Sequence, residues 1–62
     1  MKKYIIAARK QQFIVDAENE FRAIQAVIAA TDLFAYDVDI CHLFDSYPVK
    51  LQTRLLTSSI IL

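Results

Sequence analysis

The chain has 62 residues, enough for one small domain at most, and its seven basic residues balance seven acidic ones. It contains no glycine, which excludes phosphate-binding loops of the Walker and dinucleotide types. Its single cysteine and single histidine exclude an internal disulfide and a Cys/His zinc site within one chain.

Apolar residues are unusually frequent for so small a protein. They make up 56% of the chain, above the usual ~45–50%, and a domain of this size buries only about 60% of its unfolded surface. The composition therefore predicts that the surplus is covered in a homo-oligomer or against another protein. The neutral charge balance does not favour a strongly basic nucleic-acid binder.

The sequence predicts a cytoplasmic protein. The apolar run YIIAA after Met1–Lys3 breaks at Arg9, too early for a signal peptide, and no stretch approaches the ~20 apolar residues of a membrane span. A single unpaired cysteine, Cys41, fits a reducing compartment.

Two short strands come first in chain order. Residues 3–8 (KYIIAA) are apolar and β-branched in the middle, and residues 13–17 (FIVDA) alternate between two faces. Between them, RKQQ at residues 9–12 lacks the Asn-Gly or Gly-X pair of two-residue hairpins. We therefore expect a longer loop between these strands.

A helix follows the second strand. Asn19 is a favoured N-cap, and Glu20 places a negative charge at the positive end of the helix dipole. Beyond them the apolar spacing becomes helical, and one broad stripe holds Phe21, Ile24, Val27, Ile28 and Thr31, with Ala23 beside it. The junction is interpreted as a helix cap; the alternative is an exposed contact patch of Glu18, Glu20 and Arg22.

Residues 36–44 (YDVDICHLF) predict a third strand. Strict alternation would put Tyr36, Val38, Ile40, His42 and Phe44 on one face and Asp37, Asp39, Cys41 and Leu43 on the other. The next four residues, DSYP at 45–48, have the side chains of a turn.

The last segment admits two interpretations. As a strand, Val49, Leu51, Thr53 and Leu55 oppose Lys50, Gln52 and Arg54; as a helix, Pro48 would lie in the first turn, but the apolar side chains would scatter. We favour a fourth strand. The apolar end Ile60, Ile61 and Leu62 is expected to form an oligomer interface. The predicted fold is thus a small α+β domain over residues 1–62, ordered ββαββ, with one helix on an antiparallel or mixed sheet.

No catalytic, metal or cofactor site is predicted. His42 is the only side chain that ordinarily titrates near neutrality, but adjacent strand residues point apart, so Cys41 would not pair with it as a nucleophile.

Two groups of charged residues are candidate binding surfaces. Asp37 and Asp39 share a predicted face, and with Tyr36, Glu18 and Glu20 they form a candidate protein-binding set. The alternative is a nucleic-acid-binding module in which the N-terminal cluster of Lys2, Lys3, Arg9 and Lys10 contacts phosphates.

The first half of the chain resembles a ββα unit of small, largely uncharacterised bacterial and phage proteins. The resemblance is carried by a Tyr-containing first strand, an F-x-V-x-A second strand and a capped helix with Ala-Ile in its second turn: Tyr4, Phe13, Val15, Ala17, Asn19, Ala23 and Ile24. Such proteins include small inhibitors of the anti-CRISPR type, which act by binding. The resemblance implies a non-enzymatic protein that binds, and inhibits, a host protein.

Overall fold

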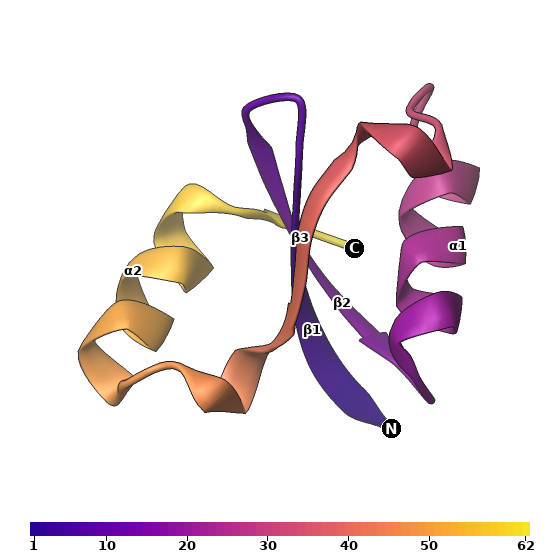
Figure 1. Cartoon of the computed structure of the whole chain (residues 1–62). Helices are drawn as coiled ribbons and strands as arrows, with labels where there is room; N and C mark the ends of the chain where they lie inside the picture. The colour runs from indigo at the N-terminus through magenta and orange to yellow at the C-terminus, as the bar shows by residue number, and fades with distance from the viewer.

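The computed structural model describes all 62 residues as a four-stranded sheet with one helix on each face. The helices and strands in chain order are β1 (Lys2–Ala8), β2 (Gln11–Ala17), α1 (Glu20–Ala30), β3 (Val38–Leu43), α2 (Val49–Ser58) and β4 (Ile60–Ile61). Figure 1 shows the sheet nearly edge-on between α1 and α2. The strand order is β3-β1-β2-β4, and β4 runs parallel to β2 while the other pairs are antiparallel. The predicted α+β class is confirmed, and of the antiparallel or mixed sheets predicted, the mixed one is present; two helices, instead of the one predicted, pack on it.

The hairpin of β1 and β2 closes through a two-residue turn, so the longer loop predicted there is wrong. Ala8 pairs with Gln11, which leaves only Arg9 and Lys10 between the strands. Both have positive φ, 49° and 65°, as a type I′ turn requires. The pairing of seven apolar-rich residues on each strand therefore outweighs the left-handed strain, about 1–2 kcal/mol for each non-glycine residue.

The main core lies between the sheet and α1. The predicted cap is confirmed, since the Asn19 side chain accepts a hydrogen bond from the Arg22 N–H at 2.9 Å. The buried residues of this core are Tyr4, Ile6, Ala8, Phe13, Val15, Ala17, Ala23, Val27 and Leu33. Phe21 is predicted on the buried stripe but is 66% exposed, because the buried face of α1 is formed by Ala23 and Val27, four residues apart.

The third strand is shorter than predicted and does not alternate strictly. Residues 35–37 form a 3₁₀ turn, and the register against β1 shifts between Ala7, which pairs with Ile40, and Ala8, which pairs with Val38. This irregularity puts Val38 on the α1 side together with Cys41, so the predicted face containing both Val38 and His42 is wrong. An extra residue in one strand of a pair changes which face the following side chains occupy.

Residues 49–58 form a helix, so the strand favoured for this segment is wrong. Pro48 precedes the first turn, where its missing N–H is tolerated, and the segment contains good helix formers. Two apolar residues of this helix, Val49 and Leu56, remain exposed. A strand is favoured for this segment only if every apolar side chain in it must be buried, and the helix does not bury them all.

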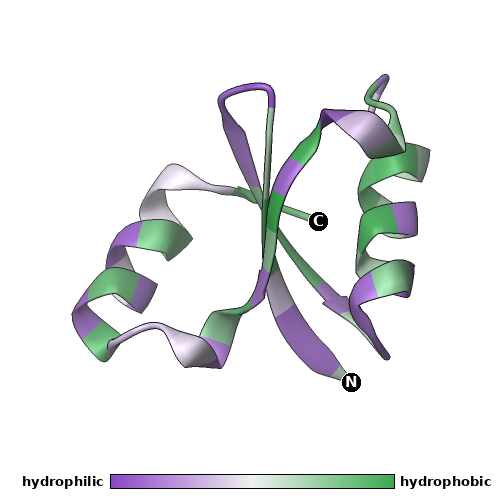
Figure 2. Cartoon of the chain, viewed as in Figure 1, coloured by the Kyte–Doolittle hydropathy of each residue, from purple (hydrophilic) through white to green (hydrophobic).

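A second, smaller core lies under α2. It consists of Ile5, Ile14 and Phe44, with Tyr47 and Leu55 packed against it. No residue of α2 is itself buried. Figure 2 shows apolar residues along α1 and the C-terminal strand, and a hydrophilic β1–β2 turn. Neither helix is long and apolar enough to cross a membrane.

Candidate protein-binding surface

The loop from α1 to β3 is held by hydrogen bonds to its own backbone. The Thr31 hydroxyl donates to the Val27 carbonyl at 2.7 Å and accepts from the Leu33 N–H at 3.1 Å. The Leu33 side chain is buried in the main core. Both ends of residues 31–33 are thereby fixed to α1, which sets where the following residues emerge.

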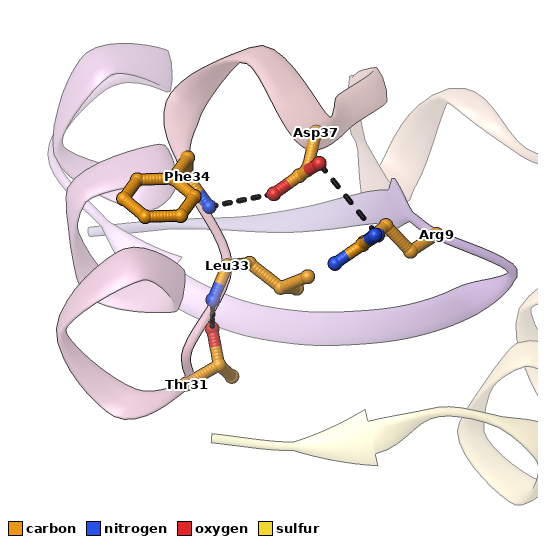
Figure 3. A network of polar contacts seen from close by, with 5 residues as sticks. All are labelled: Arg9, Thr31, Leu33, Phe34 and Asp37. Atoms are coloured by element: carbon orange, nitrogen blue, oxygen red, sulfur yellow. Dashed lines mark hydrogen bonds and ion pairs between the residues drawn. The ribbon is translucent and has the colours of Figure 1, made fainter.

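Asp37 fixes the second half of this loop. Its carboxylate accepts a hydrogen bond from the Phe34 N–H at 2.8 Å, and its own N–H donates to the Phe34 carbonyl at 2.9 Å. Figure 3 shows the carboxylate between the Phe34 N–H and Arg9, whose Nε lies 3.7 Å from it. The Asp37 side chain is only 11% exposed. This residue therefore holds the loop in place and offers little of itself to a partner.

The held loop displays two aromatic rings to solvent. Phe34 and Tyr36 stack with centroids 5.3 Å apart and planes 6° from parallel, yet they are 58% and 81% exposed. Stacking restricts the rotation of both rings, which reduces the side-chain entropy that binding would cost. Aromatic side chains also supply the largest apolar area per residue in protein interfaces. We name Phe34 and Tyr36 the aromatic pair.

The structure separates the acidic residues of the candidate protein-binding set. Tyr36 belongs to the aromatic pair and Asp37 lies beneath it. Asp39 lines a pocket with Ile40, whereas Glu18 and Glu20 lie at the opposite end of α1, about 16 Å away for an 11-residue helix. These five residues do not form one acidic patch.

The basic residues of the alternative set are separated too. Lys2 and Lys3 begin β1 and Arg9 and Lys10 follow its end, so about 20 Å lies between the two pairs. Two of the four cations are already paired, with Lys3 Nζ 3.3 Å from Asp16 and Arg9 Nε 3.7 Å from Asp37. The cluster seen in the sequence is therefore two small groups in space.

Cys41 and His42 face different layers. Cys41 packs against the main core, and burial together with the charge of Glu20 raises the pKa of its thiol to about 11. His42 lies on the α2 side, where its Nδ1 is 3.0 Å from the Tyr47 hydroxyl. A thiol with so high a pKa forms little of the nucleophilic thiolate at neutral pH. No three side chains with metal-binding groups come together.

The C-terminal residues form part of the sheet. Ile60 and Ile61 are β4, paired with Phe13 and Ile14, and the Leu62 N–H donates to the Ile14 carbonyl at 2.9 Å. All three terminal side chains remain partly exposed. An oligomer interface at these residues stays a prediction.

No protein-family model matches the chain, and comparison with curated proteins and with solved structures finds no match either. The site is therefore defined by geometry alone. Phe34 is not among the residues singled out from the sequence, because it falls between the predicted helix, whose apolar stripe ends at Thr31, and the strand predicted from Tyr36. The available signal was the spacing Phe34-x-Tyr36-Asp37, in which an acidic side chain three residues on can bond the first N–H.

Proposed function

We propose that the protein is a non-enzymatic binding protein that attaches to another protein through the aromatic pair and acts on that partner by occupying its surface. The resemblance of the first half of the chain to small phage and bacterial inhibitors supports a role as an inhibitor of a host protein in the cytoplasm.

The exposed, stacked aromatic pair on a hydrogen-bonded loop carries this proposal. Phe34 and Tyr36 have no role in either core, because neither belongs to the buried clusters or packs against them. The loop beneath them nevertheless has a buried Leu33 and a bonded Asp37. A rigid loop that presents unburied rings is the arrangement of an interface anchor, where truncation typically costs 2 kcal/mol or more, about 30-fold in affinity.

Two observations support binding over catalysis and over nucleic-acid recognition. Cys41 and His42 point into different layers, and the raised pKa of the thiol disfavours a nucleophile. The four basic residues of the alternative set are divided between the ends of β1, and two of them are paired. Phosphate contacts gain from several adjacent unpaired cations.

The test is affinity capture from an extract of the cells in which the protein acts, with quantitative mass spectrometry. The Phe34→Ser/Tyr36→Ser variant removes both rings, and Phe21→Ser is the matched control because Phe21 is an exposed ring without a stacking partner. We expect a protein that is retained by the wild type and the control but reduced about tenfold or more with the double variant.

Equal retention by all three proteins would refute the role of the aromatic pair. Circular dichroism of each variant checks that the fold is intact. If the retained species is instead RNA or DNA, and its binding weakens steeply with salt, the nucleic-acid alternative replaces the proposal.

A further inference from the structure

A pocket of about 460 Å³ lies on the α2 side of the sheet, beside the β1–β2 turn. Its apolar lining comes from three strands, with Ala7 of β1, Ile40 of β3 and Ile60 of β4. The last residue of α2, Ser58, also lines it, so the pocket lies where that helix ends. It is an open hollow on the surface, because every lining residue except the half-buried Ala7 is exposed.

The polar lining includes one cation and one anion that are not paired. Lys10 and Asp39 both line the pocket, and neither belongs to either of the two ion pairs in the structure. Their neighbours in sequence behave differently, because Arg9 pairs with Asp37 beneath the aromatic pair. Arg9 and Asp37 therefore form an ion pair, whereas Lys10 and Asp39 keep their charges unpaired.

A third polar group is oriented beside these charges. The Ser59 hydroxyl donates to the Gln12 Oε1 at 3.4 Å, and no other hydrogen bond of this amide is present. The Gln12 Nε2 therefore keeps both of its N–H groups for a further acceptor. The pocket thus combines two donor groups, one carboxylate and an apolar lining.

These features are complementary to a small molecule that carries both charges. We propose that the pocket binds a free α-amino acid with an aliphatic side chain. Its carboxylate would accept from Lys10 and Gln12, and its ammonium group would donate to Asp39. Its side chain would cover Ala7, Ile40 and Ile60. The contacts of the amino acid with Lys10 and with Asp39 would both be charge-assisted hydrogen bonds, which are stronger than those between neutral groups.

The backbone at Lys10 adds a second argument. Its φ of 65° is a conformation in which glycine or asparagine is favoured in a type I′ turn. A lysine there adds strain, and its side chain makes no hydrogen bond or ion pair within the protein. Residues held in sparsely populated backbone conformations cluster at functional sites.

The test is an NMR titration of the full chain with L-leucine, followed through the backbone amide signals of the pocket strands. Leucine methyl ester lacks the carboxylate charge, and N-acetyl-leucine lacks the ammonium charge. We expect saturable shifts of the Ala7, Gln12 and Ile40 amide signals with leucine. Either derivative should bind at least about tenfold more weakly.

Matched variants separate the site from general electrostatics. Lys10→Gln and Asp39→Asn should each weaken leucine binding about tenfold while the spectrum of the free protein stays folded. Lys50→Gln and Asp45→Asn are the controls, because both residues are exposed and neither lines the pocket. These controls should bind leucine as the wild type does.

Three results would overturn the proposal. One is the absence of saturable shifts at the highest soluble concentration of leucine. Another is equal binding of leucine and N-acetyl-leucine, which would make the site one for carboxylic acids. The third is unchanged affinity in both Lys10→Gln and Asp39→Asn. None of these results bears on protein capture through the aromatic pair, which lies outside the pocket lining.

Discussion

Replacing Lys10 with glycine should make the protein more stable, although it removes a charged side chain from a tight turn. Lys10 is one of only two residues with positive φ, and its value of 65° lies in the left-handed region. In that region the Cβ of an L-residue crowds the following carbonyl oxygen. Glycine has no Cβ and adopts the same conformation without the crowding.

The size of the gain follows from two opposing contributions. Removing the crowding contributes about 1–2 kcal/mol, whereas the greater freedom of glycine in the unfolded chain subtracts about 0.5–1 kcal/mol. The difference spans about 0–1.5 kcal/mol, and we take the middle of this range, about 0.5–1 kcal/mol, as the expected net gain in the free energy of unfolding. In a domain of this size, 1 kcal/mol changes Tm by about 4–8 °C, so we expect Lys10→Gly to raise Tm by about 2–8 °C.

The assay is thermal and urea denaturation followed by circular dichroism, with two matched controls. Lys10→Ala removes the charge but keeps the Cβ, so it should give no comparable rise in Tm. Gln11→Gly places glycine one residue later, where φ is not positive, and should lower the stability by about 0.5–1 kcal/mol. Similar changes in Tm for Lys10→Gly and Lys10→Ala would refute the argument from strain.

Further predictions concern the cap, the loop and the thiol. Asn19→Ala removes the bond to the Arg22 N–H and should lower the free energy of unfolding in urea by about 1 kcal/mol. Asp37→Ala should speed hydrogen exchange of the Phe34 amide about tenfold or more by NMR, whereas Asp45→Ala should not change it. Burial raises the pKa of the Cys41 thiol from 9.0 to about 11, which favours the protonated folded state. Stability from this source is complete below pH 9 and lost as the pH rises to 11, so wild type should lose more stability over that interval than Cys41→Ala. A loss of equal size in both proteins would contradict this.

The elements that the sequence predicted correctly have local signals. The alternation in residues 13–17 and the cap at Asn19 each depend only on residues nearby in the sequence. Both appear in the structure. The β1–β2 hairpin was predicted for the same reason. Its turn was not, because Arg9 and Lys10 adopt positive φ under the constraint of strand pairing, which no turn propensity expresses.

The remaining features depend on contacts between distant segments. The faces of residues 38–43 follow from a register shift against Ala7 and Ala8, which strict alternation does not anticipate. For residues 49–58, helix propensity favours a helix, whereas the spacing of apolar residues favours a strand. The segment is a helix, and it leaves Val49 and Leu56 exposed to solvent. The aromatic pair and the pocket both arise where the β1–β2 turn meets the segment from 34 to 40, which sequence order alone does not bring together.

The way β4 completes the sheet has a consequence for the order of folding. The Ser59 hydroxyl reaches Gln12 across 47 residues, and β4 pairs with the middle of β2, whereas β1, β2 and α1 are consecutive in the chain. Local contacts form early and long-range ones late, so β4 and α2 should assemble last onto a preformed hairpin and α1. Because α2 buries none of its own residues, this layer should also detach first. Detachment of this layer would uncover Ile5 and Ile14 and disrupt the pocket beside Ile60. A molecule bound in the pocket would therefore stabilise the attached state of α2 and β4.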